Sequence, residues 1–323
     1  MEGARLGSNR WLVLGRAGMD LYADPPGTHV DAAQAFFPAL GGSAANIAVG
    51  IARLGGSAAL LTTVSRDAVG SFVLNELRRY GVETEGVRRV EGEARTSLAV
   101  LATRNDDTQS VIYRNGAADF QLASEDVEKI DFGRFGGLIV TGTSLAAEPS
   151  RAAAFIAAQR ARSAGAYVFF DVDYRPYSWE SGGVAASVGR KFAALSDVVV
   201  GNDEEFAVLS EGGDGEALAA SMATSAAAAV YKMGSRGSRT FVGGDVIDTP
   251  IFQVAPLKPT GAGDAFMAGL TTGLAQGGDW AASLRRGAAA AAIVVTGVGC
   301  SPAMPGAAEL DAFMRGRSSA VGA

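Results

Sequence analysis

Short runs of consecutive apolar residues alternate along this chain with longer segments in which apolar residues recur at helical spacing. Residues 11–15 (Trp-Leu-Val-Leu-Gly) predict a buried strand, and residues 68–80 carry Phe72, Val73 and Leu77 on one face of a helix. Strands and helices in alternation favour a mostly parallel sheet with helices on both faces, a three-layer α/β/α fold. The remaining predicted elements are strands at 58–64, 138–141, 167–171 and 198–200, a hairpin at 239–242 and 246–252, and helices at 41–54, 150–164, 184–195, 262–276, 280–294 and 307–314.

Two segments depart from this alternation. Residues 20–39 are irregular and rich in Pro and Gly, whereas residues 96–104 and 109–113 alternate like strands around a turn at 105–107. We expect one domain over residues 1–323, with the segments of approximately 20–40 and 95–121 inserted in the core as a small β-sheet lid. A lid would exclude water from a reaction site, and a plain edge hairpin is the alternative.

The composition of the 323-residue chain excludes several classes of protein. A net charge of −6 argues against nucleic-acid binding, which usually needs a basic surface. No uninterrupted apolar stretch approaches the ~20 residues that span a bilayer, and residues 1–5 lack a signal-peptide pattern. We therefore expect a cytoplasmic protein whose partners are small molecules, with neither a membrane nor a nucleic acid among them.

The single Cys and the single His limit the available chemistry. Cys300 and His29 are too few for a disulfide framework or a Cys/His zinc site. No G-x-S-x-G elbow accompanies His29, so a hydrolase triad is not indicated. Acid–base chemistry must therefore come from carboxylates, Tyr, Lys or Arg.

The most informative motif is the Thr-Gly-Ala-Gly-Asp run at residues 260–264, which an apolar helical pattern follows at once. A Gly-rich turn that opens a helix offers free N–H groups to an anion such as a phosphate. The carboxylate of Asp264 could then take a proton from a hydroxyl that attacks this phosphate. The alternative is an ordinary helix start with Thr260 as its N-cap. The chain has no Gly-Lys dipeptide for a Walker A loop and no dinucleotide fingerprint at residues 212–215, so ATP would need another device.

Four motifs in order along the chain resemble the signatures of the ribokinase-like (pfkB) carbohydrate kinases. They are the run at 260–264, Gly-Gly-Ser-Ala-Ala-Asn at 41–46, N-x-x-E at 202–205 and K-x-G-x-x-G at 232–237. The resemblance covers nearly the whole chain. It implies a ribokinase-like three-layer α/β/α sandwich that transfers a phosphoryl group from ATP, with Mg²⁺, to a sugar hydroxyl.

The resemblance also implies roles for individual residues. Asp264 would be the general base, beside an anion hole formed by Gly261, Ala262 and Gly263. Asp20 and Asn46 would bind sugar hydroxyls, unless the Asn46 amide is merely solvated in the first helical turn. Gly41 and Gly42 would let the backbone approach the sugar closely. Glu205 would organise Mg²⁺ through water. The residues implied for ATP are Asn202, Lys232, Gly234, Gly237, Thr260 and, unless they form an ordinary helix C-cap, Gly297 and Gly299.

Two further segments resemble kinases of keto-deoxy sugar acids. Residues 171–179 resemble a D-x-N-x-R-x-x-x-W segment, with Asp173 in place of Asn, and residues 113–119 resemble a Y-R-x-x-S-A segment. Arg114 and Arg175 could each grip a carboxylate through two parallel N–H bonds. Alternatively each forms a surface ion pair, for example Arg175 with Asp171 or Asp173.

Residues 15–22, 64–70 and 95–99 narrow the resemblance to the 5-dehydro-2-deoxygluconokinases of myo-inositol degradation. Arg16 would add positive charge near the acid. This resemblance implies phosphorylation of the terminal hydroxyl of 5-dehydro-2-deoxy-D-gluconate to give its 6-phosphate. The alternatives are 2-dehydro-3-deoxygluconate kinase, then fructokinase or ribokinase, or a non-catalytic sugar or nucleotide sensor.

Lys258 departs from the family pattern. Members that need a monovalent cation often carry Asp at this place, six residues before the catalytic Asp, so a cation requirement is in doubt here. The Lys258 ammonium either replaces the cation or is an ordinary exposed lysine. The lid strands, in turn, could pair with a second subunit to form a homodimer, or their edge could be covered within one chain.

Overall fold

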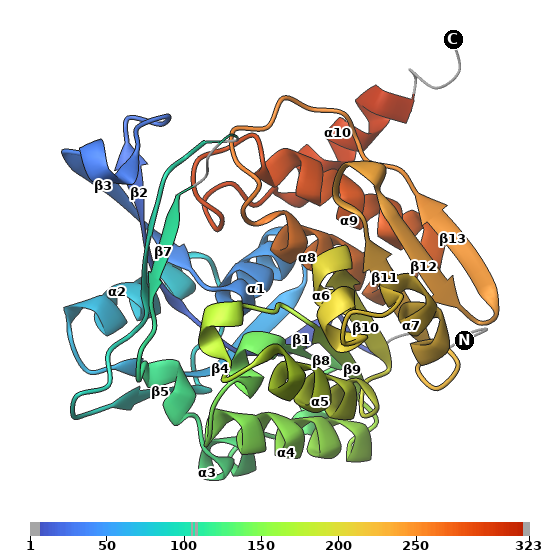
Figure 1. The fold of residues 1–323 in the computed structure, drawn as a ribbon, viewed down its shortest axis with the longest axis horizontal. Helices are drawn as coiled ribbons and strands as arrows, with labels where there is room; N and C mark the ends of the chain where they lie inside the picture. Colours follow the sequence, from blue (N-terminus) through green and yellow to red (C-terminus); the bar gives the residue numbers. More distant parts are fainter. Residues whose placement is uncertain (1–6, 105, 107–108, 319–323) are drawn as a thin grey trace.

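The computed structural model describes residues 7–104, 106 and 109–318, and a nine-stranded sheet forms their centre (Figure 1). The strand order is β13-β12-β11-β10-β9-β8-β1-β4-β5, in which β12 pairs antiparallel with both β11 and β13 and all other neighbours pair parallel. This confirms the predicted mostly parallel sheet. The strands are β1 (Arg10–Leu14), β4 (Ser57–Ser65), β5 (Val87–Val90), β8 (Gly137–Thr141), β9 (Tyr167–Asp171), β10 (Val198–Asn202), β11 (Ala228–Lys232), β12 (Ser238–Val242) and β13 (Asp245–Thr249).

Helices cover both faces of this sheet and bury both sides of its central strands. In β1, Trp11 and Val13 belong to one hydrophobic cluster, while Leu12 and Leu14 belong to the other. A strand buried on both faces needs apolar residues at every position, which explains the continuous apolar runs in the sequence. The first cluster includes α1 (Ser43–Arg53), α2 (Ala68–Arg79), α8 (Ala262–Ala275), α9 (Trp280–Val294) and α10 (Ala307–Ser318); the second includes α3 (Ser124–Glu128), α4 (Ser150–Ser163), α5 (Gly182–Ala193), α6 (Asp203–Leu209) and α7 (Gly215–Met222).

Small residues let α8 approach its neighbours closely. A Cβ built on Gly269 would lie 2.8 Å from backbone atoms of α9, and one built on Gly50 of α1 would lie 2.6 Å from the Cβ of Ala268. The Ala- and Gly-rich composition of these helices therefore serves their packing. No helix in the described part of the chain is long and apolar enough to cross a membrane.

A second, four-stranded sheet stands beside the main one, on the left of Figure 1. Its order is β3-β2-β6-β7, built from β2 (Gly18–Asp24), β3 (Ala35–Gly41), β6 (Leu98–Leu101) and β7 (Ser110–Tyr113). This confirms the expected small β-sheet, but the expectation that residues 20–39 are irregular is wrong at both ends of that segment, because β2 and β3 pair antiparallel over their whole length. Pro25 and Gly27 fall in the connection and Pro38 on an edge strand, where proline is tolerated. Of the predicted turn at 105–107, residues 105 and 107 lie outside the described residues.

Candidate active site

A cavity of about 840 Å³ lies at the carboxyl ends of the parallel strands, where open α/β sheets bind ligands. Residues of the small sheet, of α8 and of α9 complete its walls. Most of the residues that the sequence motifs single out meet here. Those that line the cavity are Arg16, Asp20, Gly42, Asn46, Arg114, Asp173, Arg175, Asn202, Glu205, Lys232, Gly234, Gly237, Lys258, Thr260, Gly261, Ala262, Gly263 and Asp264.

The turn at residues 260–263 opens α8 toward the cavity. The N-cap is Gly261, with a left-handed φ of 87°, so the alternative that Thr260 caps the helix is wrong. Glycine adopts this φ without strain, and a Cβ here would lie only 3.0 Å from the Cys300 Sγ. The first intrahelical bond runs from the Ala265 N–H to the Gly261 carbonyl, which leaves the preceding N–H groups of the helix for an anion.

Asp264 is held by a hydrogen bond from α1. The Asn46 Nδ2 donates to the Asp264 Oδ2 at 2.8 Å, and the Ser301 Oγ donates to the Asn46 Oδ1 at 2.7 Å. The alternative of a solvated Asn46 amide is therefore wrong, since the side chain is buried. Burial and the charge of Asp173 raise the pKa of Asp264 to about 7, against the lowering effect of the Asn46 hydrogen bond. A carboxyl with a pKa near neutrality suits a general base.

Four carboxylates surround the ammonium of Lys232. Its Nζ lies 3.9 Å from the Asp171 Oδ1, and a Cβ built on Gly263 would lie 3.3 Å from it, which places the charge beside the anion-binding turn. Burial alone would lower the pKa of Lys232, but Asp171, Glu205, Asp264 and Asp173 raise it. Burial in turn raises the pKa of Asp171, well above its usual value.

The N-x-x-E motif forms the start of α6. The Asn202 side chain accepts from the Glu205 N–H at 2.8 Å, and the Glu205 Oε2 accepts from the Asn202 N–H at 2.7 Å, a reciprocal capping box. This pair fixes Glu205 at the cavity, where burial raises its pKa. The buried carboxylates of Glu205 and Asp171 are ligands of the kind that a divalent cation binds. Among the described residues, no three His, Cys, Asp or Glu side chains cluster as a ready-made metal site.

Asp20 and the Gly pair form another wall. The Asp20 Oδ2 accepts from the Tyr22 hydroxyl at 3.2 Å, whereas its Oδ1 is buried without a partner in the described chain. Burial raises the pKa of this carboxyl. A Cβ on Gly41 would overlap the Asp20 carboxylate, and Gly42, with a φ of 96°, packs against the Arg16 carbonyl. Gly41 thus acts from behind Asp20 and does not itself line the cavity.

The three predicted arginines differ in how they are held. Arg114 donates to Asp119 and, at 3.0 Å, to the Thr143 carbonyl, but its buried Nη1 has no hydrogen-bond partner among the described residues. The Arg16 Nη1 donates to the Ser97 Oγ at 2.9 Å. Arg175 pairs with the Asp173 Oδ1 at 2.8 Å, the ion pair weighed from the sequence, although both residues line the cavity.

Asp173 has an unusual backbone for a residue other than glycine. Its φ is 37°, a region that Asn and Asp tolerate better than other side chains. The replacement of Asn by Asp in this motif therefore keeps the turn. The Asp173 Oδ2 accepts from the Ser43 and Thr143 hydroxyls, at 2.5 and 3.2 Å, so this carboxylate ties three segments of the cavity wall together.

Lys258 is completely buried, so the alternative of an exposed lysine is wrong. Its Nζ donates to the Thr260 carbonyl at 2.7 Å and to the Val294 carbonyl at 3.2 Å. Burial lowers the pKa of this ammonium. Backbone carbonyls are also the ligands that a potassium ion takes in proteins.

Two predicted residues do not reach the cavity. Gly297 and Gly299 are absent from its lining, and nearby Ala288, Ala291, Ala292 and Val295 contribute to the wall instead. They also do not cap α9, whose C-cap is Val295 with ordinary helical geometry. The C-cap alternative is therefore wrong, and the ATP contact of Gly297 and Gly299 stays a prediction.

From the sequence, no site role was predicted for Asp171 or Ser301. Asp171 ends a strand beside the cavity, and that position was the available signal. Ser301 carried no signal, because its partner Asn46 is 255 positions away in the sequence.

Comparison with known proteins agrees with this geometry. The model of the pfkB family of carbohydrate kinases matches residues 8–307. The chain belongs to the pfkB family. This pfkB kinase is 39% identical over 302 residues to a 5-dehydro-2-deoxygluconokinase of Photobacterium profundum, covering 91% of each chain.

Solved structures of sugar kinases resemble the fold. A fructokinase of Xylella fastidiosa with bound ATP is 28% identical, with a TM-score of 0.87, over 96% of this chain and 99% of the other. A double mutant of the Vibrio cholerae fructokinase, with fructose, ADP and potassium bound, is 27% identical, with a TM-score of 0.82, over 94% of this chain and 97% of the other. These matches confirm the ribokinase-like fold and a carbohydrate kinase.

Proposed function

We propose that this pfkB kinase transfers the γ-phosphoryl group of ATP to the terminal hydroxyl of 5-dehydro-2-deoxy-D-gluconate, giving the 6-phosphate and ADP. The observation that carries the proposal is the position of Asp264. Its carboxyl has a pKa near 7. Asp264 lies in the first turn of α8, the helix whose first N–H groups lie at the cavity beside Lys232. A base, an anion site and a cation thus converge at one point.

The proposed reaction needs no covalent intermediate on the protein. Asp264 takes the proton of the sugar hydroxyl. The hydroxyl oxygen bonds to the γ-phosphorus as the bond from that phosphorus to the leaving ADP oxygen breaks. The N–H groups of Ala262 and Gly263, with the Lys232 ammonium, stabilise the charge on the transferred group. Mg²⁺ would be held near Glu205 through water and would neutralise phosphate charge.

A sugar acid is favoured over a neutral sugar by the arginines. The Arg114 Nη1 is buried in the cavity wall and lacks a partner in the described residues, so a substrate carboxylate would satisfy it. At the sugar, the unpartnered Asp20 Oδ1 can accept from a hydroxyl, and Asn46 keeps a second N–H for another. The likeness to the Photobacterium profundum 5-dehydro-2-deoxygluconokinase supports this choice of acid.

The Lys258 ammonium is proposed to replace a monovalent cation. It already donates hydrogen bonds to the carbonyl oxygens of Thr260, just before Gly261, and of Val294, at the end of α9. The potassium in the Vibrio cholerae fructokinase structure makes this a difference worth testing within the family.

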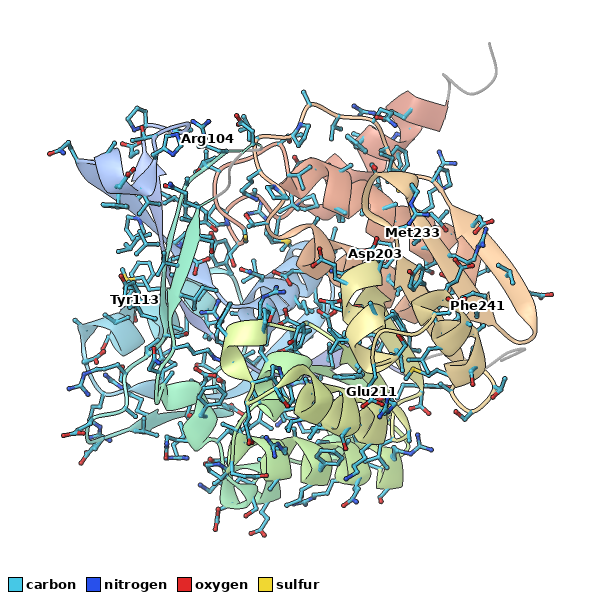
Figure 2. The ribbon with its side chains drawn as sticks, viewed as in Figure 1. Arg104, Tyr113, Asp203, Glu211, Met233 and Phe241 are labelled. Carbon is cyan, nitrogen blue, oxygen red and sulfur yellow. The ribbon has the colours of Figure 1, made fainter. Side chains whose placement is uncertain are left out.

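The small sheet is proposed to act as a lid and as the contact of a homodimer. Its register puts Asp20 and Ala99 on the cavity side and Phe36, Val111 and Tyr113 on the opposite side. Tyr113, labelled in Figure 2, is 60% exposed on β7. An exposed apolar sheet face fits a second copy of the chain. Val111→Lys should convert a dimer to a monomer in sedimentation analysis, and a wild-type monomer would refute the contact.

A coupled ADP-release assay tests the function. With Mg-ATP, turnover should be highest on 5-dehydro-2-deoxy-D-gluconate, lower on 2-dehydro-3-deoxygluconate, and weak on fructose and ribose. Turnover on fructose alone would favour the second candidate, fructokinase, which the structural likeness at 28% identity supports. Asp264→Asn should abolish turnover while ATP still binds; near-normal rates would refute the base.

A further inference from the structure

A hydrogen-bonded chain reaches the carboxylate of Asp264 from outside the cavity. Ser301, in the segment between α9 and α10, donates to the Asn46 Oδ1, and Asn46 donates through Nδ2 to Asp264. Ser301 is 0% exposed and Asn46 is 4% exposed, so water does not compete for these bonds. Ser301 does not line the cavity.

The hydrogen bonds of this series run from donor to acceptor toward Asp264, the proposed base. The acceptor-only carboxylate of Asp264 requires the Nδ2 end of the amide, and the Ser301 hydroxyl donates to the opposite end, Oδ1. Without the Ser301 bond the amide would be held at one end only and would donate to the carboxylate in a less regular geometry. Ser301 therefore holds the amide in the position that favours the charged form of the base.

Helix packing brings the two ends of the chain together. α1 and α8 lie side by side (Figure 1), and Asn46 and Asp264 are each four residues before a small residue, Gly50 and Ala268. Residues four apart share a helix face, so the two pairs lie opposite one another. A Cβ on Gly50 would lie 2.6 Å from the Ala268 Cβ, which only a wider helix separation could relieve.

We propose that Ser301 is a positioning residue for catalysis, which acts through Asn46 to orient the Asp264 carboxylate, and that Gly50 sets the helix separation that this chain requires. The inference rests on Asp264 being the base. It adds two residues to the proposed machinery: Ser301, which lies outside the cavity, and Gly50, which lies one helical turn from Asn46.

Ser301→Ala tests the chain with a matched control. We expect kcat to fall about 5- to 10-fold, the effect of one lost hydrogen bond, with little change in the KM for ATP. The acid limb of the pH–rate profile should also move to higher pH, because Asn46, no longer held by Ser301, donates less well to the carboxylate. Ser283→Ala removes an equally buried hydroxyl that has no partner in the described chain, and should change neither quantity.

The charged and titratable groups around Asp264 remain in the Ser301 variant, so the shift of the limb reports on the chain alone. They are Asp171, Asp173, Arg175, Lys232, Lys258 and Cys300. Asn46→Asp, which replaces the donor by a second carboxylate, should move the limb further in the same direction. A lower melting temperature of Ser301→Ala with an unmoved limb and unchanged kcat would overturn the inference.

Gly50→Ala tests the helix separation. It should lower kcat as Ser301→Ala does, and adding Ala268→Gly should restore most of the loss by removing the opposing methyl group. Gly316→Ala, in open space on α10, is the control for helix propensity. Unchanged kcat in Gly50→Ala would overturn this part. If Asp264→Asn itself stays active, the base assignment fails; if it is inactive while Ser301→Ala is normal, only the positioning chain fails.

Discussion

Two lysines lie beside the same turn, and their surroundings differ completely. Lys232 ends β11 among the carboxylates of Asp171, Asp173, Glu205 and Asp264, which raise its pKa. Lys258 is enclosed by backbone carbonyls, and burial lowers its pKa. Burial disfavours both ammonium groups; four carboxylates outweigh it and raise the pKa of Lys232, whereas Asp264 and Asp20 do not outweigh it at Lys258.

The difference suggests separate tasks for the two charges. Lys232 keeps its charge, reaches the cavity and lies near Gly263. These are the properties that a phosphate-binding side chain needs. Lys258 donates hydrogen bonds to two main-chain oxygens, those of Thr260 and Val294, so it shapes the turn instead of contacting substrate. Exchanging each lysine for Met therefore should not give the same defect.

Of the two lysine exchanges, Lys232→Met is expected to have the larger effect. Loss of a preorganised charge on the transferred phosphoryl group should lower kcat about 10²- to 10³-fold. Lys232→Arg should recover part of the rate because it keeps the charge. Lys191→Met, at an exposed position on α5, is the control. Steady-state kinetics decide the matter, and a loss below about threefold would mean that Lys232 only lines the nucleotide site.

Lys258→Met should act mainly on stability. The Thr260 and Val294 carbonyls would lose a buried donor, while the cost of burying the ammonium would also vanish. We expect a net decrease of about 1 to 3 kcal/mol in the free energy of unfolding, measured by urea denaturation. An unchanged midpoint relative to Lys191→Met would show that the turn does not depend on Lys258.

The position of Lys232 could be predicted from the sequence, whereas the burial of Lys258 could not. Lys232 belongs to a recognisable motif at a strand end, and its place at the cavity followed. The burial of Lys258 could not be predicted, because lysine is almost never fully buried unless its charge is paired, and its partners are carbonyls 2 and 36 positions away.

The fold shows the same contrast. Strands buried on both faces, such as β1 and β9, were predicted nearly to the residue, because a continuous apolar run is a local signal. The segment of approximately 20–40 was expected in a small β-sheet, but β2 and β3 were not delimited within it, since Pro25, Gly27 and Pro38 obscure the alternation and the pairing itself is not a local signal. Contacts across the sequence, such as that from Asn46 to Asp264, 218 positions apart, were likewise hidden.

The pH–rate profile sharpens the comparison further. With a pKa of about 7, Asp264 should give wild-type kcat/KM an acid limb near pH 7, which falls tenfold per pH unit below it. The positive charge of Lys232 lowers that pKa, so the limb should move to higher pH in Lys232→Met. Lys258→Met should leave it within a few tenths of a unit. Equal shifts in the two variants would contradict the separate tasks.

The smallest effect is expected from potassium on the wild-type enzyme. If the Lys258 ammonium replaces a cation, exchanging NaCl for KCl at fixed ionic strength should change the rate less than about twofold, because screening stays constant. In Lys258→Met the freed carbonyl oxygens could accept potassium, so KCl should raise both the rate and the melting temperature of that variant but not of Lys232→Met. Strong potassium activation of the wild type would refute the replacement. A potassium effect that is equal in the two variants would show that the carbonyls around Lys258 are not the place where a cation acts.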